Sequence, residues 1–307
     1  MEKIYNLRTI KKSLEPSVVA LGTFDGVHLG HQDVIKTARK YADKHGLKLY
    51  VYTFSNNPLE TVDKVRAPKK IISNLDKEKI FEELGVDILF NVEFNENLVK
   101  ITAENFLNRL NILNYKCIVV GANYNYGFNG EGNIDTLRAS SEKNGFKLIV
   151  RDLISVEDII ISSTNIRNTL ENGEIEKANL LLGREYCIKG KVVHGDARGR
   201  TIGFKTANIN LSKFDILLPK SGVYAVKVIV DDSAFYGMAN IGLNPTFNST
   251  EKRLEVNIFK FNKDLYGKVI KVSFFKRIRN IEKFTGIDEL KKQLTEDKNK
   301  ILKYFNL

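Results

Sequence analysis

The stretch Ser17-Val-Val-Ala-Leu-Gly-Thr-Phe-Asp-Gly-Val-His-Leu-Gly-His31 decides the fold of the first half of the chain. It opens with a short apolar run that ends in a glycine, and a helical pattern follows from about residue 30 to residue 45. The glycines permit a tight turn and a close approach of the backbone to a phosphate. A helix that starts here adds free N–H donors and partial positive charge. The stretch therefore predicts a strand, a phosphate-binding loop and a helix.

His28 and His31 carry the chemistry of this loop. They lie three residues apart, so both imidazoles project from one face of the helix start. The alternatives to a triphosphate site are a metal pair or two surface histidines. Zinc-binding helices use an i, i+4 spacing, however, and no acidic partner is suitably placed. We therefore interpret the two side chains as phosphate ligands.

The alternation of strand and helix continues through the first half. The sequence predicts strands at 17–22, 47–54, 87–92, 117–121 and 146–150, and helices at 30–45, 77–84 and 102–110. Such alternation favours an α/β fold with a parallel sheet covered by helices. Ligands of these folds bind beyond the carboxyl ends of the strands, so the site is expected at the strand-to-helix loops.

The second half changes character after a helical stretch at 163–183. Short strand-like runs follow at 187–194, 222–231, 235–243, 253–261 and 269–275, separated by turn-rich pieces. This pattern predicts a small antiparallel β-barrel. A terminal helix at about 288–305 presents one apolar face, formed by Leu290, Leu294, Ile301 and Phe305. We expect two domains, residues 1–183 and 184–307.

Composition limits the class of protein. With 307 residues, 43% of them hydrophobic and 28% charged, the chain is typical of a globular protein with two medium domains. No apolar run approaches the ~20 residues that span a bilayer, and the first residues lack the apolar stretch of an export signal. We therefore expect a cytoplasmic protein without membrane partners. Cys117 and Cys187 have no Cys or His nearby at metal spacing, which favours buried, reduced thiols.

The formal charge of +11 fits nucleic acid, an anionic membrane or small polyphosphates equally well. The lysines are spread along the chain, and no recognised nucleic-acid-binding pattern accompanies them. Attraction of ATP is a sufficient explanation, so we expect no nucleic-acid partner.

The loop at 22–31 resembles the HxGH signature of the nucleotidylyltransferase superfamily, in the form found in bacterial bifunctional riboflavin kinase/FMN adenylyltransferases. Ile161-Ser-Ser-Thr-Asn-Ile-Arg167 is similar to the ISSTxIR motif of that superfamily. Read alone, its hydroxyls are only a helix-capping cluster. The resemblance implies a Rossmann-like domain that binds ATP through Gly22, Thr23, Phe24, Asp25, His28, Gly30, His31, Ser162, Ser163, Thr164 and Arg167.

The first-domain reaction implied by the resemblance is attack of the FMN phosphate on the α-phosphorus of ATP. Catalysis is then positioning and neutralisation by His28, His31, Arg167 and Mg²⁺. The segment 120–127 aligns with a family stretch at the substrate site, which implies flavin contacts from Asn123, Tyr124 and Tyr126. Tyrosines stand here where the family has Phe, and residues 54–58 also depart from the family's Phe-x-Pro-x-Pro.

The segment 190–208 resembles the riboflavin kinase pattern Gly-x-x-x-Gly-Phe-Pro-Thr-Ala-Asn, and family motifs continue through residue 284. The resemblance implies that ATP binds to Gly195, Gly199, Gly203, Thr206 and Asn208. The Thr206 hydroxyl and Asn208 amide are hard oxygen donors that suit Mg²⁺.

Glu255 is the general base that the resemblance implies for the riboflavin 5′-hydroxyl. Read alone, it is an ordinary strand residue. Asn257 shares its strand face, and Asn257 and Arg279 are the implied flavin contacts. Lys205 stands where the family has proline, and Asn257 where histidine is common.

The resemblance thus implies a transferase that uses riboflavin, FMN and ATP with Mg²⁺ and forms FMN and FAD, as a monomer or weak homo-oligomer. Two alternatives stay open. One is a monofunctional FMN adenylyltransferase with a degenerate barrel, and the other is a flavin- or nucleic-acid-binding regulator without turnover.

Overall fold

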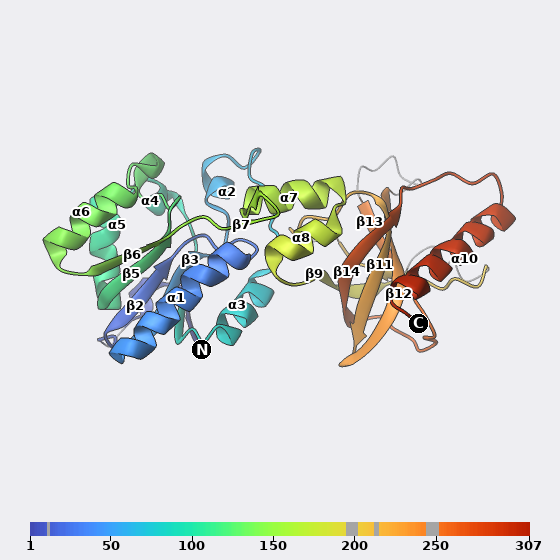
Figure 1. Cartoon of the computed structure of the whole chain (residues 1–307), viewed down its shortest axis with the longest axis horizontal. Helices are drawn as coiled ribbons and strands as arrows, with labels where there is room; N and C mark the ends of the chain where they lie inside the picture. The colour runs from blue at the N-terminus through green and yellow to red at the C-terminus, as the bar shows by residue number, and fades with distance from the viewer. Residues whose placement is uncertain (11–12, 195–201, 212–214, 244–251) are drawn as a thin grey trace. The chain divides into compact units, whose positions relative to one another are not determined.

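The computed structural model describes residues 1–10, 13–194, 202–211, 215–243 and 252–307, and divides into two compact units, 1–163 and 164–307 (Figure 1). The strands of the first unit are β1 (Glu2–Ile4), β2 (Ser17–Leu21), β3 (Lys48–Phe54), β4 (Ile88–Val92), β5 (Tyr115–Gly121), β6 (Lys147–Arg151), β7 (Ser155–Val156) and β8 (Ile159–Ile160). Its helices are α1 (Leu29–His45), α2 (Pro58–Val62), α3 (Asn74–Glu83), α4 (Glu96–Val99), α5 (Ala103–Leu110) and α6 (Ile134–Asn144), with short 3-10 turns at Leu7–Thr9, Asn111–Leu113 and Phe128–Gly130.

The second unit contains the antiparallel strands and two flanking groups of helices. Its strands are β9 (Tyr186–Val193), β10 (Ala207–Ile209), β11 (Gly222–Val230), β12 (Ser233–Leu243), β13 (Lys252–Ile258) and β14 (Val269–Arg279). Its helices are α8 (Ile175–Leu182) and α10 (Ile287–Tyr304), and α7 (Ser163–Asn172) begins at the boundary between the units.

The first unit is built on the parallel sheet that the alternation predicts. Its six strands lie in the order β1-β4-β3-β2-β5-β6, and every neighbouring pair is parallel. All five residues of β2 are buried, and this strand lies near the middle of the sheet. The expected strands are therefore confirmed, and β1 is added at one edge.

Helices cover both faces of this sheet, as Figure 1 shows. One face packs against α1 and α3 through a core cluster that includes Val34, Ile35 and Phe81. The other face packs against α5 and α6 through a cluster that includes Phe106 and Leu137. These two cores fix the loops at the carboxyl ends of the strands.

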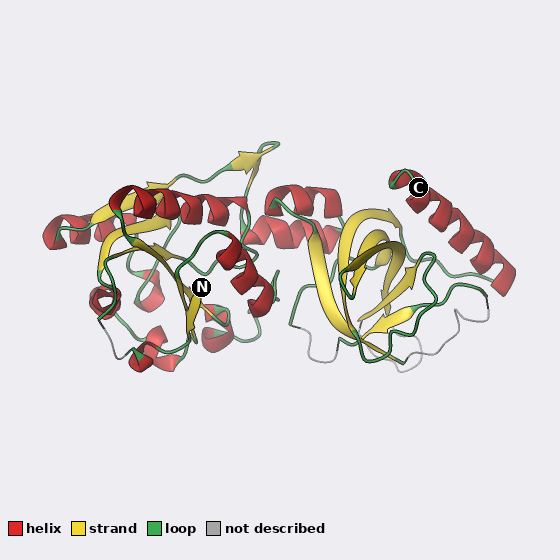
Figure 2. Ribbon diagram, turned by 90° about the horizontal axis from the view of Figure 1, so that it is seen from below, coloured by secondary structure: helices red, strands yellow, loops and turns green. Residues whose placement is uncertain are grey.

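The second unit is the expected antiparallel barrel. It closes in the order β10-β13-β12-β11-β14-β9, and all six strand pairs are antiparallel (Figure 2). Along β13 the buried residues Leu254, Val256 and Ile258 alternate with residues of intermediate burial, as expected for a strand with one core face. On α10, Ile301 is fully buried and Leu294 packs against the same cluster, as does Phe305, which follows the last helical residue. These contacts confirm three members of the expected apolar face.

The helical stretch expected at 163–183 is two helices, because Gly173 between them has a φ of 78°, which ends an α-helix. Asn179 of α8 ties this helix to the barrel: its side chain donates to the Phe274 carbonyl (2.9 Å) and accepts from the Tyr186 N–H (2.6 Å). The domain boundary expected at residue 183 stays a prediction. By its contacts, the chain divides at residue 163.

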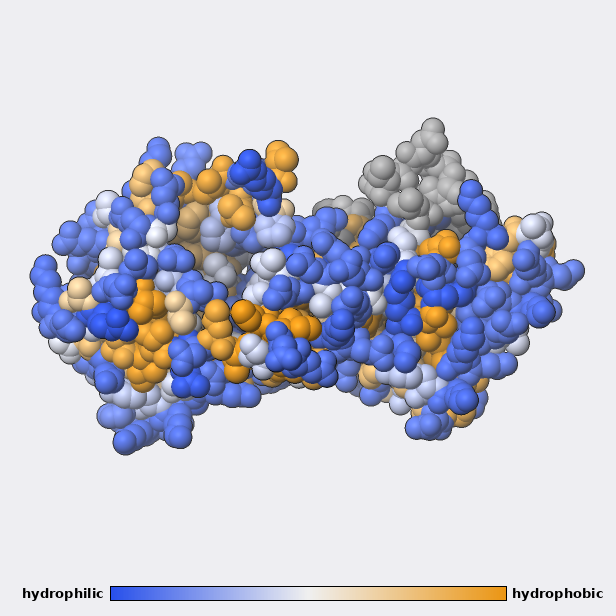
Figure 3. All heavy atoms as spheres, turned by 45° about the horizontal axis from the view of Figure 1, so that its top comes forward, coloured by the Kyte–Doolittle hydropathy of each residue, from blue (hydrophilic) through white to orange (hydrophobic). Residues whose placement is uncertain are grey.

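The surface visible in Figure 3 is mostly hydrophilic on both units, in keeping with the charged composition. Among the described residues, no helix has the length and apolar character that crossing a membrane requires. Both cysteines are free; Cys117 is buried as expected, whereas Cys187 is only partly covered.

Candidate active sites

The loop after β2 turns sharply around an inward-facing aromatic ring. Phe24 is buried, with a φ of 49°, and packs edge-on against Phe81 and His31. A Cβ on Gly22 would lie 2.9 Å from the Phe24 ring, and Gly26 has a φ of 83°, a conformation that favours glycine. These contacts explain both glycines of the motif in structural terms.

His28 and His31 lie together at the start of α1. His28 is the N-cap residue, and its Nδ1 accepts a hydrogen bond from the His31 N–H (3.3 Å). The two rings stack with centroids 3.5 Å apart and an interplanar angle of 17°. The structure therefore places both imidazoles on one side of a helix N-terminus, where N–H donors and the helix dipole favour an anion.

The loop that carries Thr23 and Asp25 is held from three directions. The Thr53 hydroxyl of β3 donates to the Thr23 carbonyl (2.9 Å). The Asp25 carboxylate accepts from the Ile71 N–H (3.1 Å), and its carbonyl accepts from the Ser163 hydroxyl (2.8 Å). The last bond brings Ser163 of the predicted Ser-Ser-Thr motif onto the predicted phosphate loop.

The remaining residues of that motif lie at the unit boundary. Ser162 precedes α7, and Thr164 and Arg167 lie within this helix. Both belong to the second unit. Their role at the ATP phosphates stays a prediction.

Tyr124 and Tyr126 lie in the apolar core beyond β5. Their rings stack at 5.8 Å with an interplanar angle of 14°, and Tyr126 also packs on Phe106. The Tyr126 hydroxyl bonds to Thr136 (3.1 Å), and burial raises the pKa of both tyrosines. The Asn123 carbonyl accepts from the Asn125 side chain (3.2 Å). The flavin role predicted for these residues remains untested, and their packing is that of core aromatics.

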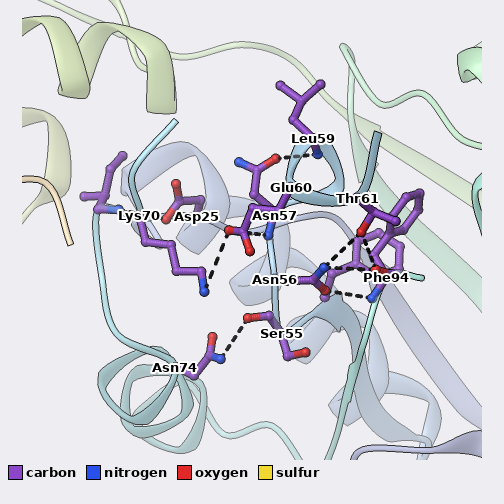
Figure 4. Close-up of polar contacts among 12 residues, drawn as sticks. Asp25, Ser55, Asn56, Asn57, Leu59, Glu60, Thr61, Lys70, Asn74 and Phe94 are labelled. Carbon is purple, nitrogen blue, oxygen red and sulfur yellow. Dashed lines mark hydrogen bonds and ion pairs between the residues drawn. The ribbon is translucent and has the colours of Figure 1, made fainter. Parts of the chain in front are cut away.

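A second group of polar residues gathers next to the phosphate loop, and the sequence motifs assigned only its members Thr23 and Asp25. A cavity of about 30 Å³ lies among Thr23 and Asp25 of the loop, residues 54–58 after β3, and the segment that leads into α3. Figure 4 shows Asp25, Lys70 and Asn57 gathered on one side of this region. The Lys70 Nζ lies 3.9 Å from the Glu60 Oε1 and forms an ion pair with it. The buried Lys77 completes the lining.

Glu255 in the barrel has two amide neighbours. It lies directly opposite Asn208 of β10 and opposite Asn240 of β12. Side chains of directly opposed residues stand on the same face and about 5 Å apart at Cβ. The structure therefore brings the predicted base beside one predicted Mg²⁺ ligand, and adds Asn240, which the sequence motifs did not assign.

Thr206 lines a larger cavity in the barrel unit, of about 280 Å³, together with Lys205, Val256, Asp264 and Tyr266. The Asn257 side chain donates to the Lys205 carbonyl (2.7 Å), so this asparagine supports the segment before Thr206. Of the three expected loop glycines, Gly203 has a φ of 84°, whereas Gly195 and Gly199 lie outside the described residues.

Arg279 contacts the terminal helix. Its Nε and Nη2 donate to the carboxylate of Asp297 (2.9 Å each), a residue that is fully buried on α10. Its Nη1 donates to the Asn280 carbonyl (2.9 Å). The flavin contact of Arg279 stays a prediction. In the structure this side chain attaches α10 to the barrel through Asp297.

Two family models match the chain, and they divide it as the fold does. The FAD synthetase model matches residues 10–165 and the riboflavin kinase model matches residues 182–305. The class defined by fold and site is thus an FAD synthetase domain followed by a riboflavin kinase barrel.

Full-length relatives give the particular family. A bifunctional riboflavin kinase/FMN adenylyltransferase of Bacillus subtilis is 43% identical over 97% of this chain and 95% of its own length. The protein of the same name from Listeria monocytogenes is 41% identical over 94% and 92%. The chain belongs to the bifunctional riboflavin kinase/FMN adenylyltransferase family. A solved structure described as a macrolide-efflux protein from Streptococcus pneumoniae has the same fold, with 35% identity, a TM-score of 0.87 and 97% coverage of both chains.

Proposed function

We propose that the loop of His28 and His31 transfers AMP from ATP to FMN, and that the barrel phosphorylates riboflavin with Glu255 as the base. The observation that carries the first assignment is the stacked pair of imidazoles at the start of α1. The chain is a riboflavin kinase and FMN adenylyltransferase that produces FMN and FAD. The proposal adds which residues perform each step.

In the first unit, a phosphate oxygen of FMN forms a bond to the α-phosphorus of ATP, and the bond from that phosphorus to pyrophosphate breaks. The attacking oxygen already carries charge, so no protein base is required. Charge on the triphosphate grows toward the leaving pyrophosphate, and we assign its neutralisation to His28, His31 and Arg167. The Ser163 hydroxyl, bonded to the Asp25 carbonyl, holds the loop in register for this contact.

In the barrel, the riboflavin 5′-hydroxyl oxygen attacks the γ-phosphorus of ATP, its proton goes to the Glu255 carboxylate, and ADP leaves. The position of Glu255 between Asn208 and Asn240 supports this role. Two amides beside a carboxylate can hold it in one orientation while it accepts the proton.

Mg²⁺ fits the barrel through Thr206 and Asn208, because a hydroxyl and an amide oxygen are hard, neutral ligands. Within the described ranges no group of three His, Cys, Asp or Glu residues could hold a metal ion. Bound there, Mg²⁺ would neutralise ATP phosphate charge. We further propose that the substrates are riboflavin, FMN and ATP, with no nucleic-acid or membrane partner, and that the protein is a cytoplasmic monomer or weak homo-oligomer. Residue 183 ends the first functional domain in this proposal.

Two substitutions test the division of labour. His31→Ala should abolish FAD formation from FMN and ATP while riboflavin phosphorylation persists. Glu255→Gln should stop FMN formation and leave adenylyl transfer intact, because it keeps the shape and removes the base. His45→Ala is the matched control, since His45 is the exposed last residue of α1. Products are resolved by chromatography after incubation with riboflavin or with FMN. Loss of both activities in a folded His31→Ala protein would mean that one ATP site serves both steps.

A further inference from the structure

Lys77 is a buried lysine in the first unit that the reaction described above does not use. It lies on α3, which begins after the N-cap residue Ser73, and only 5% of its surface is exposed. Its ammonium donates a hydrogen bond to the Phe54 carbonyl at the end of β3 (2.8 Å). Lysine is almost never fully buried unless it is paired, so this position calls for a functional explanation.

The ammonium has hydrogen-bonding capacity to spare. It carries three N–H donors, and among the described residues the structure records one bond for it, to Phe54. Burial is the main cause that lowers the pKa of Lys77 to about 8; nearby Lys70 lowers it further, whereas Asp25 and Glu78 oppose the shift. Because this value lies above neutrality, the side chain is still mostly protonated at pH 7.

Lys77 lines the small cavity next to the phosphate loop, together with Thr23, Asp25 and Lys70. The volume of about 30 Å³ exceeds the roughly 10–15 Å³ that one water requires, so a phosphoryl oxygen fits this space. The ammonium groups of Lys77 and Lys70 and the carboxylate of Asp25 line it. Lys70 pairs with Glu60 at 3.9 Å, and the Asp25 carboxylate accepts from the Ile71 N–H. Lys77 is therefore the main positive charge that a phosphate would meet here.

The cavity adjoins the expected triphosphate site, because Thr23 and Asp25 line it. β2 lies between β3 and β5, and the order of the strands reverses between β2 and β5. Ligands of such sheets bind at this switch point, beyond the carboxyl ends of the strands. The cavity also adjoins residues 54–58, at the carboxyl end of β3. It therefore flanks the loop of Thr23 and Asp25 on the β3 side, next to the place where ATP is expected.

We propose that the Lys77 ammonium binds the phosphate monoester of FMN and positions its attacking oxygen for the α-phosphorus of ATP. This inference rests on the proposed role of the His28 and His31 loop in holding the triphosphate. Lys77 transfers no proton in the step, because the phosphate attacks as an anion. Its ammonium offers two N–H donors and one positive charge to the negatively charged phosphate of FMN.

The test compares Lys77→Met with Lys79→Met in the full-length protein. Lys79 is exposed on the same helix, so its variant removes the same charge from the surface. FAD formation is measured with varied FMN and with varied ATP, and the reverse reaction is measured with FAD and varied pyrophosphate. A lost hydrogen bond to a charged group lowers kcat/KM by about 10- to 100-fold. We expect this loss for FMN in Lys77→Met, a KM for pyrophosphate within about threefold of wild type, and no effect of Lys79→Met.

Two results overturn the proposal. An unchanged kcat/KM for FMN in Lys77→Met removes the role altogether. If Lys77→Met instead raises the KM for pyrophosphate and leaves the kinetics with FMN unchanged, the ammonium binds the pyrophosphate portion of ATP and not FMN. If wild type forms no FAD from FMN and ATP, the proposed function itself is wrong, which is a separate outcome.

The pH dependence of kcat/KM for FMN distinguishes a binding role of Lys77 from a purely structural one. The kcat/KM for FMN in wild type should decline as the pH rises through about 8, the pKa of the ammonium that faces Asp25, Lys70 and Glu78. Lys77→Met should lack that decline. Lys77→Met leaves the Phe54 carbonyl without this donor, which lowers the stability of the first unit. Circular dichroism of the full-length variant therefore checks that the first unit is folded. Should Lys77→Met unfold, Lys77→Gln takes its place in the same assay, and an unchanged kcat/KM for FMN in that variant rejects the proposal.

Discussion

Removal of the Asp297 carboxylate should unfold the barrel unit at a lower temperature. Asp297 is fully buried on α10 and accepts two hydrogen bonds from Arg279, whose side chain is 12% exposed. In Asp297→Ala the guanidinium keeps its charge and loses this partner. Breaking a buried ion pair from one side costs about 3 kcal/mol or more, which in a unit of this size lowers Tm by about 6–12 °C.

Differential scanning calorimetry of the full-length protein measures this shift, with Glu282→Ala as the matched control. Glu282 lies 3.9 Å from the same guanidinium but is half exposed, so its loss should cost less than about 0.5 kcal/mol. A shift below 2 °C in Asp297→Ala, or an equal shift in both variants, would refute the reasoning. Riboflavin kinetics add a second readout. If Arg279 only attaches α10, Arg279→Met and Asp297→Ala should raise the KM for riboflavin equally, whereas a flavin contact makes the Arg279 variant worse.

Three further outcomes follow from the described contacts. Gly22→Ala should lower stability by about 1–3 kcal/mol and depress FAD formation, because its Cβ would lie 2.9 Å from the Phe24 ring; a wild-type melting curve contradicts this. Lys205→Pro should leave FMN formation within about tenfold of wild type, because the carbonyl that accepts from Asn257 remains; a complete loss would show that the lysine side chain is needed. Removal of transition metals by a chelator, with Mg²⁺ then supplied, should leave both reactions intact, and a requirement for zinc would reassign His28 and His31.

Much of the fold could be predicted because its signals are local. The apolar run through Leu21 and the helical pattern after it appear in order along the chain, and they became β2 and α1. Strand β1 was not predicted, because three residues at a sheet edge carry too short a pattern. The helical stretch at 163–183 gave no sign of its break, since a single glycine within a helical pattern is common.

The candidate sites differ in the same way, by whether their residues are close together in the sequence. His28 and His31 could be found because residues on one helix turn are neighbours in both sequence and space. Lys77 could not be found in this way, because its surroundings, the Phe54 carbonyl and the Asp25 carboxylate, are distant from it in sequence. Glu255 was found through a motif, yet its position opposite Asn240 depends on the pairing of β12 with β13, which no local pattern specifies.

The three-residue strand β10 closes the barrel by pairing with both β9 and β13. Without it, those two strands would present open edges, and unpaired edges recruit other chains into aggregates. β10 also carries Asn208, the proposed ligand for nucleotide-bound Mg²⁺. A ligand held there at 100 times its Kd would stabilise the closed form by about 2.7 kcal/mol. A nucleotide bound through Asn208 would thus favour the form of the barrel in which the edges of β9 and β13 are both covered.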